Sequence, residues 1–167
     1  MIEITLTLFS GSVILRRATR NDLPAILGLL ANDPISASRG DTNRAEDRPA
    51  YERAFAAIDE DPGQQLLVAT SIEGEVLGTM QLTVIPGLAR VGSSRLQIEA
   101  VRVRADHRSR GIGGAMIRWA VDTAPSHGAQ LVQLTSDSAR VDAHRFYERL
   151  GFTGSHVGFK YSLPEIR

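Results

Sequence analysis

The sequence contains no cysteine, which excludes disulfides, thiolate catalysis and cysteine-based zinc sites. Its four histidines are scattered without the spacing of metal ligands, so we expect no metal site. The 19 basic residues are balanced by 19 acidic ones, and we expect neither nucleic acid nor a membrane as a partner. No apolar run approaches about 18 residues, and the N-terminus lacks the basic start of a signal peptide. These absences favour a cytoplasmic protein.

The composition that remains is typical of a globular domain. The chain has 167 residues, of which 43% are hydrophobic and 23% charged, enough for one domain with a core. The apolar patterns predict the order βααβββαβαβ and therefore an α+β fold. Strands are expected at 13–19, 64–72, 76–85, 95–103, 131–136 and 157–163, helices at about 21–31, 48–61, 111–126 and 140–150, and loops at 32–44 and 86–94.

The first 12 residues, "MIEITLTLFSGS", form a separate problem. Polar and apolar residues alternate there as in a short strand, and the pattern breaks at "SGS". This segment is either an extra edge strand or an N-terminal extension, and the alternation does not decide between them. We expect residues 13–167 to form a single domain.

The stretch "RSRGIGG" (108–114) lies between a predicted strand and a predicted helix. A helix N-terminus presents unpaired N–H groups, and glycines let a phosphate approach the backbone closely. Arg108 and Arg110 add charged donors. The alternative is a plain strand–helix turn whose glycines supply positive φ angles.

Two other phosphate-binding motifs fit this stretch poorly. A P-loop requires Gly-Lys-Ser/Thr, and the only lysine of the chain is Lys160. A dinucleotide-binding fingerprint opens a unit of parallel strands, whereas here a predicted antiparallel hairpin precedes the glycines.

The stretch "VRVRADHRSRGIGG" resembles motif A of the GNAT N-acetyltransferase family, whose signature is Arg/Gln-x-x-Gly-x-Gly/Ala. Arg108, Gly111 and Gly113 fill that signature. Downstream, "DAHRFYERLGF" (142–152) is similar to the family's motif B, and the order of elements also agrees from residue 13 to residue 163.

The resemblance implies a mixed, mostly antiparallel sheet with helices on both faces and strands that splay at a bulge, where acetyl-CoA binds as co-substrate. It implies that the pantetheine arm lies along Val101, Arg102 and Val103, and the diphosphate on the turn formed by Arg108, Ser109, Arg110, Gly111, Ile112, Gly113 and Gly114. The valines could equally be core residues, and the arginines could pair with surface carboxylates. Arg140 stands where many members carry Asn, and its guanidinium would replace the usual amide contact with phosphate.

Two residues are candidates for catalysis. The resemblance makes Tyr147 the general acid that protonates the leaving thiolate, although a tyrosine here could also only pack. Glu99 is the candidate base, expected to share a strand face with Gln97, Val101 and Val103. An ion pair of Glu99 with Arg95 or Arg102 is the alternative. His107 and His144 are weaker candidates for the base.

The resemblance therefore implies acetyl transfer from acetyl-CoA to a primary amine by direct attack, since no cysteine can carry the acetyl group. The acceptor would be a small molecule or a peptide. A non-enzymatic acyl-CoA binding or sensing module is the alternative, and a nucleotide-binding regulator is a third. In this family residues 28–60 and 85–95 usually select the acceptor. The charge of the first loop is mixed and does not choose one. The stretch "VIPGLARVG" is mostly apolar and could line the acceptor pocket or form a homodimer contact.

Overall fold

The computed structural model describes residues 3–9, 11–37 and 40–163. The chain divides into two compact units, residues 1–134 and residues 135–167. The strands of the first unit are β1 (Glu3–Thr7), β2 (Ser12–Arg17), β3 (Gln64–Thr70), β4 (Val76–Ile85), β5 (Ser94–Val103) and β6 (Ala129–Leu134). Its helical segments are η1 (Arg20–Asp22), α1 (Leu23–Ala31), α2 (Pro34–Ala37), η2 (Ala45–Asp47), α3 (Arg48–Glu60), α4 (Ala89–Gly92), η3 (Ala105–His107), α5 (Ile112–Thr123) and η4 (Ala124–His127).

The six strands form one sheet in the order β1-β2-β3-β4-β5-β6. Every neighbouring pair is antiparallel except β5 and β6, which run parallel. A parallel neighbour needs a crossover, and α5 supplies it. The α+β prediction and the mixed, mostly antiparallel sheet are confirmed.

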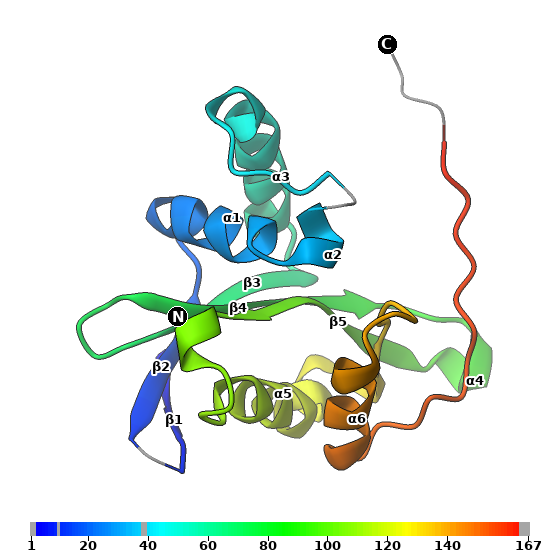
Figure 1. The fold of residues 1–167 in the computed structure, drawn as a ribbon. Coiled ribbons are helices and arrows are strands. Elements are labelled where there is room, and N and C mark those ends of the chain that lie inside the picture. Colours follow the sequence, from blue (N-terminus) through cyan, green and yellow to red (C-terminus); the bar gives the residue numbers. More distant parts are fainter. Residues whose placement is uncertain (1–2, 10, 38–39, 164–167) are drawn as a thin grey trace. The chain divides into compact units, whose positions relative to one another are not determined.

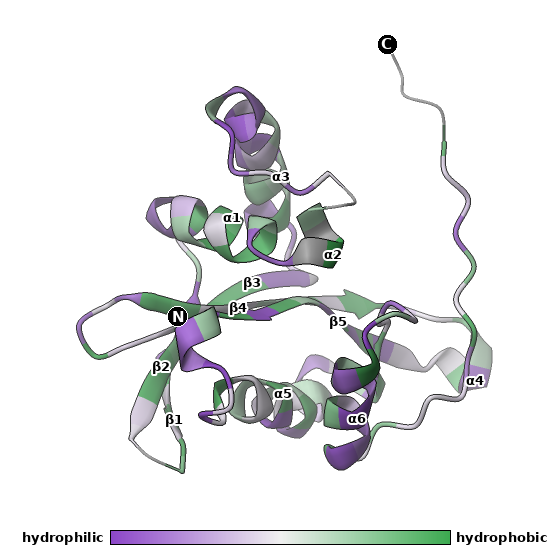
Figure 2. Ribbon diagram, in the orientation of Figure 1, coloured by the Kyte–Doolittle hydropathy of each residue, from purple (hydrophilic) through white to green (hydrophobic). Residues whose placement is uncertain are grey.

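Helices cover both faces of this sheet (Figure 1): α1 and α3 lie on one face and α5 on the other. The α1 sequence "LPAILGLLA" is largely hydrophobic, whereas α3 carries both hydrophilic and hydrophobic residues (Figure 2). On the other face, Ile112, Met116 and Ala120 of α5 are buried. A side chain at Gly78 would lie 3.3 Å from the Met116 sulfur, so this glycine lets α5 approach β4 closely.

The start of α1 is fixed to β2 by one buried carboxylate. Asp22 accepts hydrogen bonds from Arg16 Nη1 and Nη2, both at 2.8 Å, and from the Thr19 N–H at 2.7 Å. Because the Arg16 guanidinium and the Thr19 donors favour the ionised form, the pKa of Asp22 falls to about 2. This cluster sets where α1 begins on the sheet.

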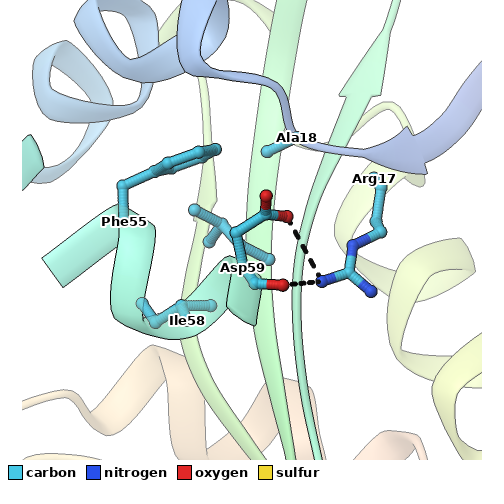
Figure 3. A pocket seen from close by; sticks show the side chains of 6 residues that line it. Arg17, Ala18, Phe55, Ile58 and Asp59 are labelled. Atoms are coloured by element: carbon cyan, nitrogen blue, oxygen red, sulfur yellow. Dashed lines mark hydrogen bonds and ion pairs between the residues drawn. The ribbon is translucent and has the colours of Figure 1, made fainter. Parts of the chain in front are cut away.

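A small hollow lies between α3 and strands β2 and β3 (Figure 3). Arg17 Nη2 donates to the Asp59 carbonyl at 3.3 Å and to its carboxylate at 3.4 Å. Ala18, Phe55 and Leu66 of the lining also pack in the small core around Val68. The hollow therefore belongs to the packing of α3 on the sheet.

The second unit contains α6 (Val141–Arg149), as predicted within one residue at each end. The prediction of a strand at 157–163 is wrong, because these residues pair with no strand that the structure describes. Their alternating apolar side chains Val157, Phe159, Tyr161 and Leu163 are instead exposed. Two predicted loops also contain short helical segments, α2 within 32–44 and α4 within 86–94.

Candidate functional site

A β-bulge interrupts β5 near its end. Gln81 of β4 lies opposite Glu99, and Thr79 lies opposite Arg102. The single residue between Thr79 and Gln81, Met80, therefore lies opposite two residues of β5, Ala100 and Val101. Ala100 has φ +52°, an unusual angle for a residue with a side chain. An extra residue of this kind bends a strand and re-aims the residues that follow it.

The bulge overturns one prediction about Glu99. Residues directly opposite each other in an antiparallel pair point to the same face, and Thr79 and Gln81 share a face because they are two residues apart. Glu99 therefore shares its face with Arg102, not with Val101 and Val103 as simple alternation predicted. This is the face that α1 and α3 cover.

Beyond the bulge, β5 has an open edge within the first unit. Its ladder to β6 ends at the pair Ile98 and Leu134, while its ladder to β4 continues to Val103. The Arg104 N–H donates to the Leu77 carbonyl of β4 at 2.8 Å. Because backbone groups alternate between the two edges of a strand, those of Val101 and Val103 face the open edge.

Two arginine side chains lie along this edge. Arg102 Nη1 donates to the Val101 carbonyl at 2.8 Å, and Arg108 Nε donates to the Val103 carbonyl at 3.2 Å. The second contact joins the turn at 108–114 to the end of β5. The structure thus brings together two groups of predicted site residues, the strand end and the glycine turn.

The turn itself has the backbone geometry that close approach requires. Ser109 and Gly111 have φ angles of +61° and +90°, and the Gly111 carbonyl accepts the Ala115 N–H at 2.9 Å as the N-cap of α5. The N–H groups of the first helical turn, at Ile112, Gly113 and Gly114, have no partner inside the helix. Together with the exposed Arg108 and Arg110, they fit an anionic group such as a diphosphate.

The short helix η3 carries the chain from β5 into this turn. Arg104 Nε donates to Asp106 at 2.8 Å, and the guanidinium also lies 3.4 Å from Glu75 of the connection between β3 and β4. Hydrogen bonds from His107 and Arg104 lower the pKa of Asp106 to about 2. His107 thus lies in a charged cluster with Arg104 and Asp106 before the turn.

The sheet face around Glu99 is polar. The Glu99 carboxylate is exposed, and among the described residues it makes no ion pair. Arg102 Nε instead lies 3.9 Å from the buried Asp33, at the end of α1. Gln97 accepts a hydrogen bond from Gln133 Nε2 at 2.7 Å. Sequence reasoning missed the role of Asp33, because no local pattern joins it to a strand 70 residues away.

The remaining candidates lie in the second unit. Tyr147 of α6 packs edge-to-face against Phe146 and Phe152, with ring centroids 5.2 Å and 6.0 Å away. Arg140 is the N-cap of α6, and its carbonyl accepts the His144 N–H at 3.0 Å. His144 Nε2 lies 2.8 Å from the Asp137 carbonyl. The helix therefore holds Tyr147 within an aromatic cluster and ties His144 to the backbone before the helix.

In the described ranges no cluster of three histidine or acidic side chains could hold a metal ion. None of the described helices is long and apolar enough to cross a membrane.

Comparison with known proteins shows to which family this chain is related. The acetyltransferase (GNAT) family matches residues 32–152. An aminoalkylphosphonate N-acetyltransferase of Salmonella typhimurium is 30% identical over 149 residues, which cover 89% of this chain and 90% of that protein.

Two solved structures are similar to this one. A transcriptional regulator from Bacillus halodurans C-125 is 40% identical, with a TM-score of 0.86 and coverage of 90% of this chain and 99% of that one. Glucosamine-6-phosphate N-acetyltransferase from Arabidopsis thaliana shares the fold at 19% identity, with a TM-score of 0.73 over 90% of this chain and 97% of that one. With the family match, the full-length relative and the fold in agreement, this chain belongs to the GNAT family of acetyl-CoA-dependent N-acetyltransferases.

Proposed function

We propose that this protein acetylates the primary amine of a small molecule, using the open edge of β5 and the glycine turn to hold acetyl-CoA. The observation that carries the proposal is the continuity of these two features. The end of β5 is paired with β4 and open at its other edge, and it runs through η3 into a turn with positive φ angles at the N-terminus of α5. The family match crosses the boundary between the two units, which supports one acetyltransferase domain made of both.

In this proposal the backbone of Val101 and Val103 bonds the pantetheine arm as an added strand would. The amides from Ser109 to Gly114 hold the diphosphate. The guanidinium of Arg108, now on the Val103 carbonyl at 3.2 Å, is close enough to the turn to exchange that contact for a phosphate. Arg110 and Arg140 add positive charge.

Glu99 is proposed as the base that takes a proton from the acceptor amine, directly or through a water. Its carboxylate lies two residues before Val101 and is exposed on the α1 face of the sheet. The neutral amine nitrogen then attacks the acetyl carbonyl, a C–N bond forms, the C–S bond breaks, and the nitrogen releases its remaining extra proton to solvent. Tyr147 is proposed as the acid that returns a proton to the sulfur.

The acceptor we propose is an amine that also carries an anionic group, as in an aminoalkylphosphonate. The aminoalkylphosphonate N-acetyltransferase of Salmonella typhimurium is similar to this chain over 90% of its own length. The sheet face that bears Glu99 also bears two arginines. Along β5 on this face, Arg95 is followed by Gln97, and Arg102 comes after Glu99. The Arg95 Nε is buried and has no hydrogen-bond partner among the described residues. An anionic group of the acceptor would supply that partner.

A panel of amines tests this proposal. Purified protein is mixed with acetyl-CoA and an aminoalkylphosphonate, an amino acid, a polyamine, an amino sugar or a neutral alkylamine, and free CoA is followed with a thiol reagent. Because the chain has no cysteine, every thiol detected comes from CoA. We expect release with the aminoalkylphosphonate and a weaker response to the neutral alkylamine of equal length. If no amine of the panel causes release of free CoA, the proposal is contradicted.

A further inference from the structure

One aromatic side chain of the N-terminal hairpin has no role in the core. Phe9 lies in the connection between β1 and β2, and 94% of its surface is exposed. The connection is closed by the Leu8 N–H, which donates to the Gly11 carbonyl at 3.0 Å, and Gly11 has φ +92°. Five residue pairs join the two strands. The hairpin therefore fixes the backbone position of a ring that buries almost nothing.

One edge of this ring lies beside Gly111 of the glycine turn. A Cβ atom placed on Gly111 would be 3.3 Å from Phe9 Cδ2 and 3.6 Å from Cε2. Residues of β1 and α5 also lie close together. Phe9 lies outside the family match, which begins at residue 32, and the hairpin thus brings an exposed aromatic side chain to the start of α5.

The position of the ring relative to the diphosphate site suggests what it binds. In CoA the diphosphate joins the pantetheine arm to an adenosine. If the pantetheine arm runs along β5, the adenosine extends from the other end of the diphosphate, away from β5. Phe9 lies beside Gly111 at the border of the turn that would hold the diphosphate. An aromatic ring with a free face is a stacking surface for a nucleobase.

We propose that Phe9 stacks on the adenine of acetyl-CoA, so that the N-terminal hairpin completes the cofactor site. The inference rests on the proposed function, because it needs the diphosphate on the turn at 108–114. Base–aromatic stacking corresponds to a loss of roughly 5-fold to 150-fold in affinity when the ring is removed. At so exposed a position we expect the lower end of this range.

The test measures dissociation constants by calorimetry for two probes, CoA and 4′-phosphopantetheine, which lacks the nucleotide. Phe9→Ala should raise the constant for CoA at least about fivefold and leave that for 4′-phosphopantetheine unchanged. Phe9→Tyr, which keeps the ring, should bind CoA as the wild type does. The matched control is Ile72→Ala, at another hairpin connection, where the side chain is 75% exposed.

Three results would overturn the inference: an unchanged constant for CoA in Phe9→Ala, an equal loss for both probes, or tighter binding of CoA. An equal loss would mean that the ring supports the turn and not the nucleotide, and tighter binding would mean that it obstructs the site. If wild-type protein binds neither probe, the proposed function itself fails, which separates the two failures.

Discussion

The carboxylate of Asp22 anchors α1 to the sheet, and removing it has a calculable effect. Asp22 is 7% exposed and accepts four hydrogen bonds, two from Arg16 at 2.8 Å and two from Thr19 at 2.7 Å and 2.9 Å. These donors lower the pKa of Asp22 from 3.8 to about 2. Each unit of pKa difference between folded and unfolded protein corresponds to about 1.4 kcal/mol. Ionised Asp22 thus contributes about 2 kcal/mol to the free energy of unfolding at neutral pH.

The sign of the pH dependence follows from the direction of that shift. Because the pKa of Asp22 is lowered on folding, its contribution is complete well above 3.8 and is lost as the pH falls toward 2. About half of the contribution should remain at pH 3. We expect Asp22→Asn to lower the free energy of unfolding by about 2 kcal/mol at pH 7 and by clearly less at pH 3.

Urea unfolding followed by circular dichroism at pH 7, 5, 4 and 3 measures this difference. The control is Asp59→Asn, because the Asp59 side chain is 57% exposed and lies 3.4 Å from Arg17. An exposed pair of this kind contributes at most about 1 kcal/mol. The reasoning is refuted if the two substitutions cost the same, or if the cost of Asp22→Asn does not change between pH 7 and pH 3.

Three further substitutions test the site. Glu99→Gln should lower kcat by about 10²-fold to 10⁴-fold and flatten the rise of the rate toward alkaline pH; a steady-state profile identical to that of the wild type would clear Glu99 of the base role. Tyr147→Phe should lower kcat while leaving the dissociation constant of CoA within about twofold, as expected of a proton donor that acts only in the transition state; unchanged turnover would remove the acid role. Ala100→Gly should raise the free energy of unfolding by up to about 1 kcal/mol, because glycine tolerates φ +52°; a loss of stability in urea would contradict the strain assigned to the bulge.

Most of the fold follows from periodicity. The strands β2 to β5 and the helices α1, α3, α5 and α6 lie close to their predicted positions, because each carries the alternation of a strand or the apolar stripe of a helix. The segment 157–163 has the same alternation but no ladder partner among the described residues. A local pattern predicts which face of a strand is apolar, but it does not predict beside which strand of the sheet that strand pairs.

The candidate site was predictable where it is continuous in sequence. Arg108 to Gly114 are consecutive, so the glycine spacing predicted a turn there, and the resemblance to motif A made that turn the candidate diphosphate site. The bulge at Ala100 was not predictable, because alanine gives no sign of a positive φ, and one extra residue was enough to move Val101 and Val103 off the face of Glu99.

Contacts between distant segments left no trace in local patterns. Asp33 reaches Arg102 from the end of α1, and Phe9 reaches Gly111 from the N-terminal hairpin. Both contacts depend on the order of strands in the sheet, which periodicity does not determine.

The central claim is that acetyl-CoA lies along the open edge of β5 with its diphosphate on the turn before α5. Amide hydrogen exchange with and without CoA, read residue by residue by NMR, tests this claim directly. The account predicts slower exchange at Val101, at Val103 and from Ser109 to Gly114 when CoA is present. Binding of CoA that slows exchange elsewhere and leaves these amides unchanged would contradict it.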